Sequence, residues 1–186
     1  SPNYSIYNTG TIIGGRFIFG TKGLVNTPIQ MPGSTAEFRN AEIIGISPSN
    51  YVIEFRGGEF NNCTIYNYST VDLNSAPGSS ATVRNFQNCD IYLASGNGPY
   101  SNGSSYVSNC NIVALNGRGV YISNTYNSVI RNANDFGIGY SADVCNTTVE
   151  TDSGIAIITG YNSGTGAGGG ILNCVAINDG NDIETI

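Results

Sequence analysis

One short motif recurs along most of this chain: an apolar residue, any residue, asparagine, a small residue, any residue and a second apolar residue. Clear copies occupy 38–43, 60–65, 86–91 and 107–112, and variant copies continue to residue 176. The motif asparagines are Asn40, Asn62, Asn88, Asn109, Asn127, Asn146 and Asn173. Successive asparagines are 18 to 27 residues apart, with a mean of about 22. A repeat of this length is typical of solenoids, in which each repeat contacts only its neighbours.

The repeat is composed of short strands. Apolar residues alternate within 119–123, 137–141 and 154–158, and each of these segments opens with a glycine that suits a bend. No segment of 11 or more residues keeps apolar residues at helical spacing, and strong helix formers are scarce. We therefore expect strands and almost no helix, with Gly- and Ser-rich loops accounting for the longer repeats.

The residue after each motif asparagine is always small. These residues are Ala41, Cys63, Cys89, Cys110, Ser128, Thr147 and Cys174. If each repeat forms one coil, and coils stack at the strand spacing of about 4.8 Å, the small residues form one column at a tight inward corner. Asparagine tolerates the left-handed backbone, and its amide can bond to the amides above and below. The pattern predicts an all-β solenoid with about 22 residues per coil and an asparagine ladder along one corner.

This ladder, with its stacked small residues and glycine-led strands, resembles the right-handed parallel β-helix of pectate-lyase-like proteins, which also forms the shafts of many phage tailspikes. The resemblance covers residues 38–186 and implies the same β-helical coils there. Residues 1–37 fit the repeat less well, so we expect N-terminal strands that cap the open end of the coil. The same architecture carries lyases, hydrolases, adhesins and inert spacers, so the resemblance alone does not imply a particular chemistry.

The cysteines indicate neither a zinc site nor a disulfide framework. The chain has five cysteines, no histidine and no Cys-x-x-Cys pair, so we expect no metal and no cofactor. Cys63, Cys89 and Cys110 occupy successive coils, within the Cα distance that a disulfide permits. Parallel stacked side chains favour buried reduced thiols instead, which fits folding in a reducing cytoplasm, as for a virion protein made inside a bacterium.

The charge distribution excludes two classes of partner. Seven basic and 13 acidic residues give a net charge of −6, and the basic residues form no patch that would neutralise nucleic acid or an anionic membrane surface. The apolar runs are far shorter than the roughly 20 residues of a membrane-spanning helix. The sequence opens at Ser1 without a methionine or an apolar leader, so we expect a fragment or a processed product.

Catalysis without histidine would depend on carboxylates. Aligning the glycine-led strands places Asp135 and Asp152 at the same offset on neighbouring coils, about 5 Å apart, which is close to the separation in retaining glycosidases. Arg118 lies one coil away. Both aspartates also belong to turn sequences, where aspartate is favoured for its own backbone hydrogen bonds, and a cation site is a third interpretation.

A second acidic column pairs Glu42 with Asp90, two coils apart, with Thr64 between them. In the enzymes of this fold the groove runs over outward strand positions, and the matching positions here are Tyr121, Gly139 and Ala156. None of these can transfer a proton at neutral pH, which weakens an assignment as an enzyme.

Tyrosine offers a surface for ligand contact. The chain has 12 tyrosines, many of them in its second half, and their flat apolar faces with polar tips suit sugars or a protein partner. Tyrosine is also a favoured strand residue, so several are expected in the core. Our candidate ligand-binding residues are Tyr121, Tyr140 and Arg118.

The main hypothesis is a non-enzymatic receptor-binding or shaft domain of a phage tail fibre or tailspike. It would reside in the virion, bind a polysaccharide or protein receptor on the host surface and, by analogy, form a homotrimer. One alternative is a polysaccharide depolymerase, either a glycoside hydrolase or a lyase, that uses carboxylates. The other is a secreted adhesin on the bacterial surface.

Overall fold

The computed structural model has one kind of regular element, the β-strand, throughout the residues it describes. Those residues are 6–19, 29–31, 36–45, 58–67, 84–94, 98–99, 105–115, 119–120, 124–132, 137–141, 143–152, 154–159, 170–178 and 181–185. The described part of the chain has no helix with the length and hydrophobicity to cross a membrane.

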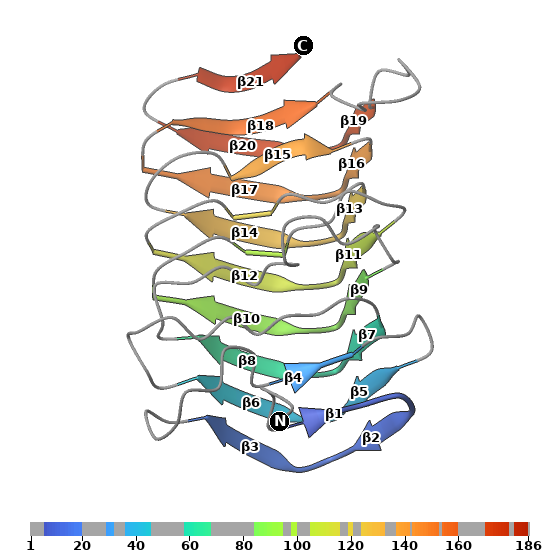
Figure 1. The fold of residues 1–186 in the computed structure, drawn as a ribbon. Helices are drawn as coiled ribbons and strands as arrows, with labels where there is room; N and C mark the ends of the chain where they lie inside the picture. Colours follow the sequence, from blue (N-terminus) through green and yellow to red (C-terminus); the bar gives the residue numbers. More distant parts are fainter. Residues whose placement is uncertain are drawn as a thin grey trace.

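The strands form three stacked parallel sheets and one short parallel pair (Figure 1). The first sheet contains, in spatial order, β3 (Arg16–Phe19), β6 (Glu42–Gly45), β8 (Thr64–Asn67), β10 (Asp90–Leu93), β12 (Asn111–Ala114), β14 (Val129–Asn132), β17 (Thr148–Thr151) and β20 (Val175–Asn178). The second contains β2 (Thr11–Ile13), β5 (Glu37–Arg39), β7 (Gly58–Asn61), β9 (Arg84–Gln87), β11 (Tyr106–Ser108), β13 (Asn124–Tyr126), β16 (Asp143–Cys145) and β19 (Gly170–Leu172). The third contains β15 (Ile138–Ser141), β18 (Ile155–Thr159) and β21 (Asn181–Thr185), and the short pair joins β1 (Ile6–Tyr7) to β4 (Ile29–Gln30).

Strands that are consecutive in the sequence lie in different sheets, whereas neighbours within a sheet come from successive repeats. Phe38, for example, is paired with Phe60, which is paired with Phe86. This connectivity confirms the predicted all-β architecture, a parallel β-solenoid with about 22 residues per turn.

Columns of similar side chains fill the interior. The inward column of the second sheet contains Ile12, Phe38, Phe60, Phe86, Val107, Thr125, Val144 and Ile171. Its three central phenylalanine rings are stacked, with centroid separations of 5.6 and 5.2 Å. The facing column of the first sheet contains Phe17, Ile43, Ile65, Ile91, Ile112, Ile130, Val149 and Ala176. Each coil thus shares its apolar core with the coils on either side, which no repeat could bury alone.

Strands β2 and β3 extend the two long sheets at one end, within the region expected to be a cap. The corner between them is Gly14-Gly15, and both glycines have positive φ, 73° and 100°. The Gly14 N–H donates to the Arg39 carbonyl at 2.8 Å, the same bond that each ladder asparagine makes one coil further on. Gly14 therefore occupies the ladder position of the first coil. The expected domain boundary after residue 37 stays a prediction.

Candidate functional site

The corner between the two long sheets carries the asparagine ladder. All seven motif asparagines have φ between 47° and 53°, the left-handed region that few residues other than glycine adopt readily. The N–H of each of the first six donates to the carbonyl that precedes the next asparagine, at 2.9 to 3.1 Å. The left-handed residue turns the chain from one sheet into the next while these bonds keep the coils in register.

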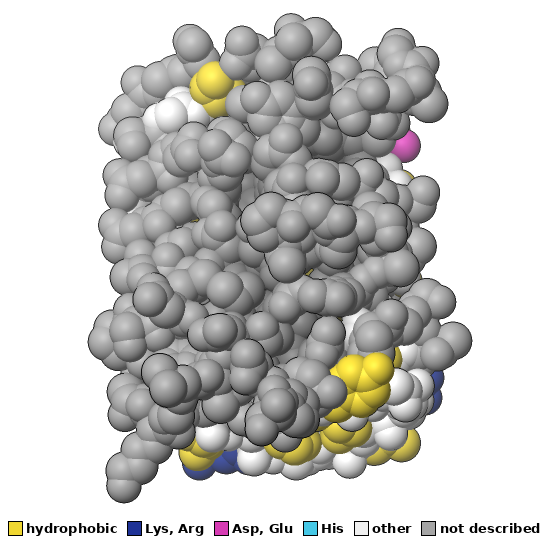
Figure 2. All heavy atoms as spheres, viewed as in Figure 1, with side chains coloured by type: hydrophobic (Ala, Val, Ile, Leu, Met, Phe, Trp, Pro, Cys, Tyr) yellow, Lys and Arg dark blue, Asp and Glu magenta, His cyan; other side chains and the backbone are white. Residues whose placement is uncertain are grey.

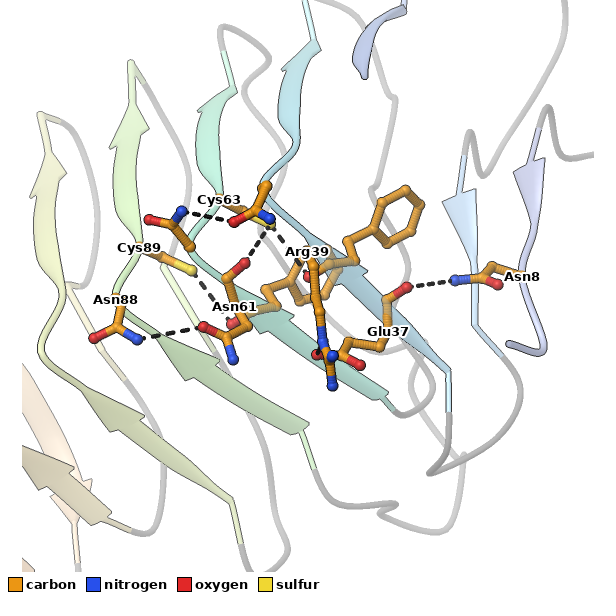
Figure 3. Close-up of polar contacts among 11 residues, drawn as sticks. Asn8, Glu37, Arg39, Asn61, Cys63, Asn88 and Cys89 are labelled. Carbon is orange, nitrogen blue, oxygen red and sulfur yellow. Dashed lines mark hydrogen bonds and ion pairs between the residues drawn. The ribbon is translucent and has the colours of Figure 1, made fainter. Parts of the chain in front are cut away.

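The side-chain amides add a second set of bonds along this corner. Asparagines donate to the previous ladder residue in the pairs Asn62–Asn40 at 2.7 Å, Asn109–Asn88 at 3.3 Å, Asn146–Asn127 at 3.1 Å and Asn173–Asn146 at 3.3 Å. Asn88 instead donates to Asn61, the neighbour of the ladder residue, at 3.3 Å (Figure 3). These amides lie at the surface, but they bond to one another, so the ladder stabilises the fold.

Behind the ladder, the small residues form a buried column. The five cysteines of the chain are free thiols, and Cys63, Cys89 and Cys110 of this column are buried. The Cys89 Sγ lies 3.1 Å from the Gln87 carbonyl and 3.4 Å from the Phe60 carbonyl of the preceding coil (Figure 3). Hydrogen bonds with Cys110 and Cys63, together with burial, raise the pKa of Cys89, so it stays a protonated thiol at neutral pH.

The third sheet does not follow the strand alignment on which the predicted pair of catalytic aspartates depends. In the third sheet Ile138 is paired with Ile157, whereas the alignment of Gly137 with Gly154 requires Ile155 as its partner. The register also shifts along β15 and β18, between Ile138 and Ser141. The predicted alignment of Gly137 with Gly154 is therefore wrong, while Asp135 lies outside the described residues, so the pairing of Asp135 with Asp152 stays a prediction.

The structure describes only some of the other predicted site residues. Asp135, Tyr121 and Arg118 lie outside the described residues, as does the side chain of Tyr140, whose backbone belongs to β15. Ala156, expected to point outward, is buried in the core.

The second predicted acidic column does form. Glu42 is paired with Thr64, and Thr64 with Asp90, as the sequence pattern indicates. The Arg16 Nε lies 2.7 Å from the Glu42 carboxylate, so this glutamate is held in an ion pair with the neighbouring strand. Asp90 is exposed.

A stripe of side chains, six apolar or aromatic and two charged, runs along the outward face of the first sheet. We call it the outer column, which consists of Ile18, Ile44, Tyr66, Tyr92, Val113, Arg131, Glu150 and Ile177. The Tyr66 and Tyr92 rings are neighbours, with centroids 6.3 Å apart and planes tilted by 51°. The register of the strands thus brings together a platform of partly exposed tyrosines that are 26 residues apart in the chain.

The outer column leads into a shallow pocket of about 180 Å³. Its lining residues are Val113, Ala114, Leu115, Arg131, Glu150 and Asp152. The Arg131 Nε donates to the Glu150 carboxylate at 3.1 Å, and both side chains remain about half exposed. Asp152 is exposed directly after β17, so one candidate residue from the sequence lines this pocket.

Sequence reasoning missed Arg131 and Glu150, although the pattern contained the information. Each residue follows its ladder asparagine, Asn127 or Asn146, by four positions. Aligning the chain on the ladder therefore places the two side chains on adjacent strands, as the register shows.

A polar cluster occupies the outward face of the second sheet. Glu37 is buried and forms an ion pair with Arg39 (Figure 3). On the neighbouring strand its register partner is Glu59. Burial, followed by the negative charge of Glu37, raises the pKa of Glu59. Burial and then the charge of Glu59 raise the pKa of Tyr106, which is hydrogen-bonded to Gln87. Within this cluster Glu37 is thus paired with Arg39, and Tyr106 with Gln87.

The described residues contain no group of three or more histidine, cysteine or acidic side chains arranged to hold a metal ion. No family model, no curated protein and no solved structure matches this chain.

Proposed function

We propose that this chain is a non-enzymatic, glycan-binding receptor or shaft segment of a phage tail fibre or tailspike, and that the glycan lies along the outer column. The observation that carries the proposal is the continuity of the Tyr66 and Tyr92 platform, through Val113, with the charged pocket at Arg131 and Glu150. An aromatic and apolar stretch is thus followed directly by two charged side chains along one line of strands.

The chemistry of this stripe matches that of a sugar polymer. A pyranose ring has an apolar C–H face, which packs on aromatic and aliphatic side chains, and hydroxyls around its rim. Carboxylates such as Glu150 and Asp152 accept hydrogen bonds from hydroxyls, and the Arg131 guanidinium donates them. Because the side chains stand on a rigid sheet, little ordering is needed on binding.

The remaining parts of the proposal rest on the tailspike resemblance. We infer a host-surface polysaccharide as the receptor, a virion location and a homotrimeric parent protein. Free buried thiols and the absence of basic patches in the sequence are compatible with this class.

Binding to a panel of purified capsular and O-antigen polysaccharides, measured by calorimetry, tests the proposal. We expect Tyr92→Ala and Arg131→Ala each to weaken binding of the recognised glycan about tenfold or more, because each removes one contact of the outer column. Tyr126→Ala is the matched control, since Tyr126 is a partly exposed tyrosine on the other long sheet, and it should leave affinity unchanged. No binding across the panel, or equal losses in all three variants, would overturn the proposal.

A depolymerase is the second candidate because Glu150 and Asp152 line the same pocket. Chromatography of the incubated glycan distinguishes the two functions. A binding protein leaves the polymer length unchanged. Release of oligosaccharides that is lost in both Glu150→Gln and Asp152→Asn would replace the binding proposal with glycoside cleavage.

A further inference from the structure

A second column of outward side chains runs beside the outer column on the first sheet. We call its first five members the polar column, which contains, in spatial order, Arg16, Glu42, Thr64, Asp90 and Asn111. Side chains two positions apart on a strand point to the same face, so Thr64 lies beside Tyr66 and Asp90 beside Tyr92. The tyrosine platform thus has a polar stripe along one side.

The carboxylates on this face are of two kinds. Glu42 and Glu150 are held in ion pairs with arginines of neighbouring strands. The carboxylates of Asp90 and Asp152 are exposed, and neither forms an ion pair or a hydrogen bond with any residue that the structure describes. These two carboxylates are therefore available to a ligand, one beside the tyrosine platform and one in the pocket.

The positive charges, by contrast, are already neutralised within the protein. Each of the three arginines whose side chains the structure describes is in an ion pair with a glutamate, namely Arg16 with Glu42, Arg39 with Glu37 and Arg131 with Glu150. The Arg131 Nη1 also lies 3.5 Å from the Asn111 Oδ1. On the face shown in Figure 2, the described basic side chains lie near the lower end, where β3 and β5 lie in Figure 1. An acidic sugar on the outer column would therefore meet exposed carboxylates without compensation by a free arginine of the described residues.

We propose that the glycan of the outer column is a polymer of amino sugars whose amino groups are unsubstituted. An ammonium group is attracted both to the face of an aromatic ring and to a carboxylate, and Tyr92 and Asp90 present these two groups side by side. Asp152 presents a second carboxylate beside the apolar side chains of Val113 and Leu115. This inference rests on the proposed glycan function and specifies its substrate class.

The separation of the two aspartates favours a polymer over a single sugar. Strand β10, which carries Asp90, and β17, which Asp152 follows, are separated by β12 and β14. Three strand spacings amount to about 14 Å. The two carboxylates would therefore receive ammonium groups from different residues of one sugar chain.

Calorimetry at about pH 6, where carboxylates are ionised, tests the inference with hexamers of glucosamine, N-acetylglucosamine and galacturonate. The glucosamine hexamer, whose amines are largely protonated, should bind about tenfold tighter than its uncharged N-acetylated counterpart. Added salt should weaken its binding, because the carboxylates are exposed. The galacturonate hexamer should bind most weakly of the three.

Variants assign the preference to the two aspartates. Asp90→Asn and Asp152→Asn should each weaken binding of the glucosamine hexamer about threefold and leave binding of the N-acetylated hexamer unchanged. Glu59→Gln, which removes the same charge from the other long sheet, is the matched control and should change neither affinity. Circular dichroism establishes that each variant folds.

Equal affinity for the glucosamine and N-acetylglucosamine hexamers, or tighter binding of galacturonate, overturns the amino-sugar inference. The proposed function stands in that case if Tyr92→Ala weakens the observed binding. A loss in Glu59→Gln as large as in Asp90→Asn also overturns the inference, as does a hexalysine peptide that binds as tightly as the glucosamine hexamer, because charge alone then explains the affinity. Binding of no glycan at all overturns both proposals.

Discussion

At the scale of single residues, the described part of the interior contains two threonine hydroxyls without a hydrogen-bond partner, those of Thr125 and Thr151. Thr125 stands between Val107 and Val144 in the inward column of the second sheet, fully buried, and its hydroxyl has no hydrogen-bond partner. Thr125→Val keeps the shape and removes this desolvated hydroxyl, so we expect the free energy of unfolding to rise by about 1–2 kcal/mol. Urea denaturation followed by circular dichroism measures the change.

A matched threonine provides the control for this substitution. Thr147 is also buried, but its hydroxyl donates to the Cys145 carbonyl at 2.9 Å. Thr147→Val should therefore lower the free energy of unfolding by roughly 1 kcal/mol. A fall in stability for both variants would mean that the Thr125 hydroxyl has a partner after all.

Glu59 gives a pH dependence at the same scale. Burial and the charge of Glu37 raise its pKa in the folded protein, so its contribution to stability is greatest at low pH and is lost as the pH rises through the folded pKa. Glu59→Gln should stabilise the protein at pH 7 by at most about 1 kcal/mol, because the carboxyl is largely solvated. The gain should shrink toward pH 4, as measured by urea denaturation at both values. A gain that grows on acidification would contradict this account.

At the scale of the element, the stability of the ladder corner depends on the left-handed backbone conformation as much as on the hydrogen bonds between side-chain amides. Asn127 has a φ of 47° and accepts a hydrogen bond from Asn146 at 3.1 Å. Asn127→Ala loses that bond and places a Cβ with no compensating interaction in the left-handed region, so we expect a loss of roughly 1–3 kcal/mol. Asn127→Gly should lose less, since Gly14 serves at the same position in the first coil. Thermal unfolding of both variants tests this order.

Most strands of the two long sheets were predictable because asparagine marks the left-handed residue at the corner between them. The left-handed corner restricts its position to a few residues, so Asn40 and its equivalents fix the register of both long sheets from the sequence. Gly14 escaped the pattern because glycine satisfies the same backbone requirement without an amide. The third sheet was misaligned at Gly137 and Gly154 because no ladder residue fixes its register there, and a shift along β15 breaks the simple offset.

At the scale of the whole molecule, the sequence predicted a continuous core but not the surface that the coils assemble. The parallel β-solenoid follows from the repeat, since stacked copies are the only way to bury each apolar face. The candidate pocket depends on which outward side chains meet across strands, and Arg131 and Glu150 come from repeats 19 residues apart. The residue types at outward positions do not repeat from coil to coil. Which outward side chains are neighbours can therefore be inferred only when the strand register is known.

The parallel stacking also determines how this molecule would respond to a pull along its axis. The main-chain bonds between coils point along that axis, so tension loads the coil-to-coil contacts one after another. Detaching one turn of about 22 residues releases roughly 75 Å of extended chain where the intact turn contributed only about 4.8 Å of height. Stretching would thus proceed by discrete, long extensions, and the weakest coil would give way first.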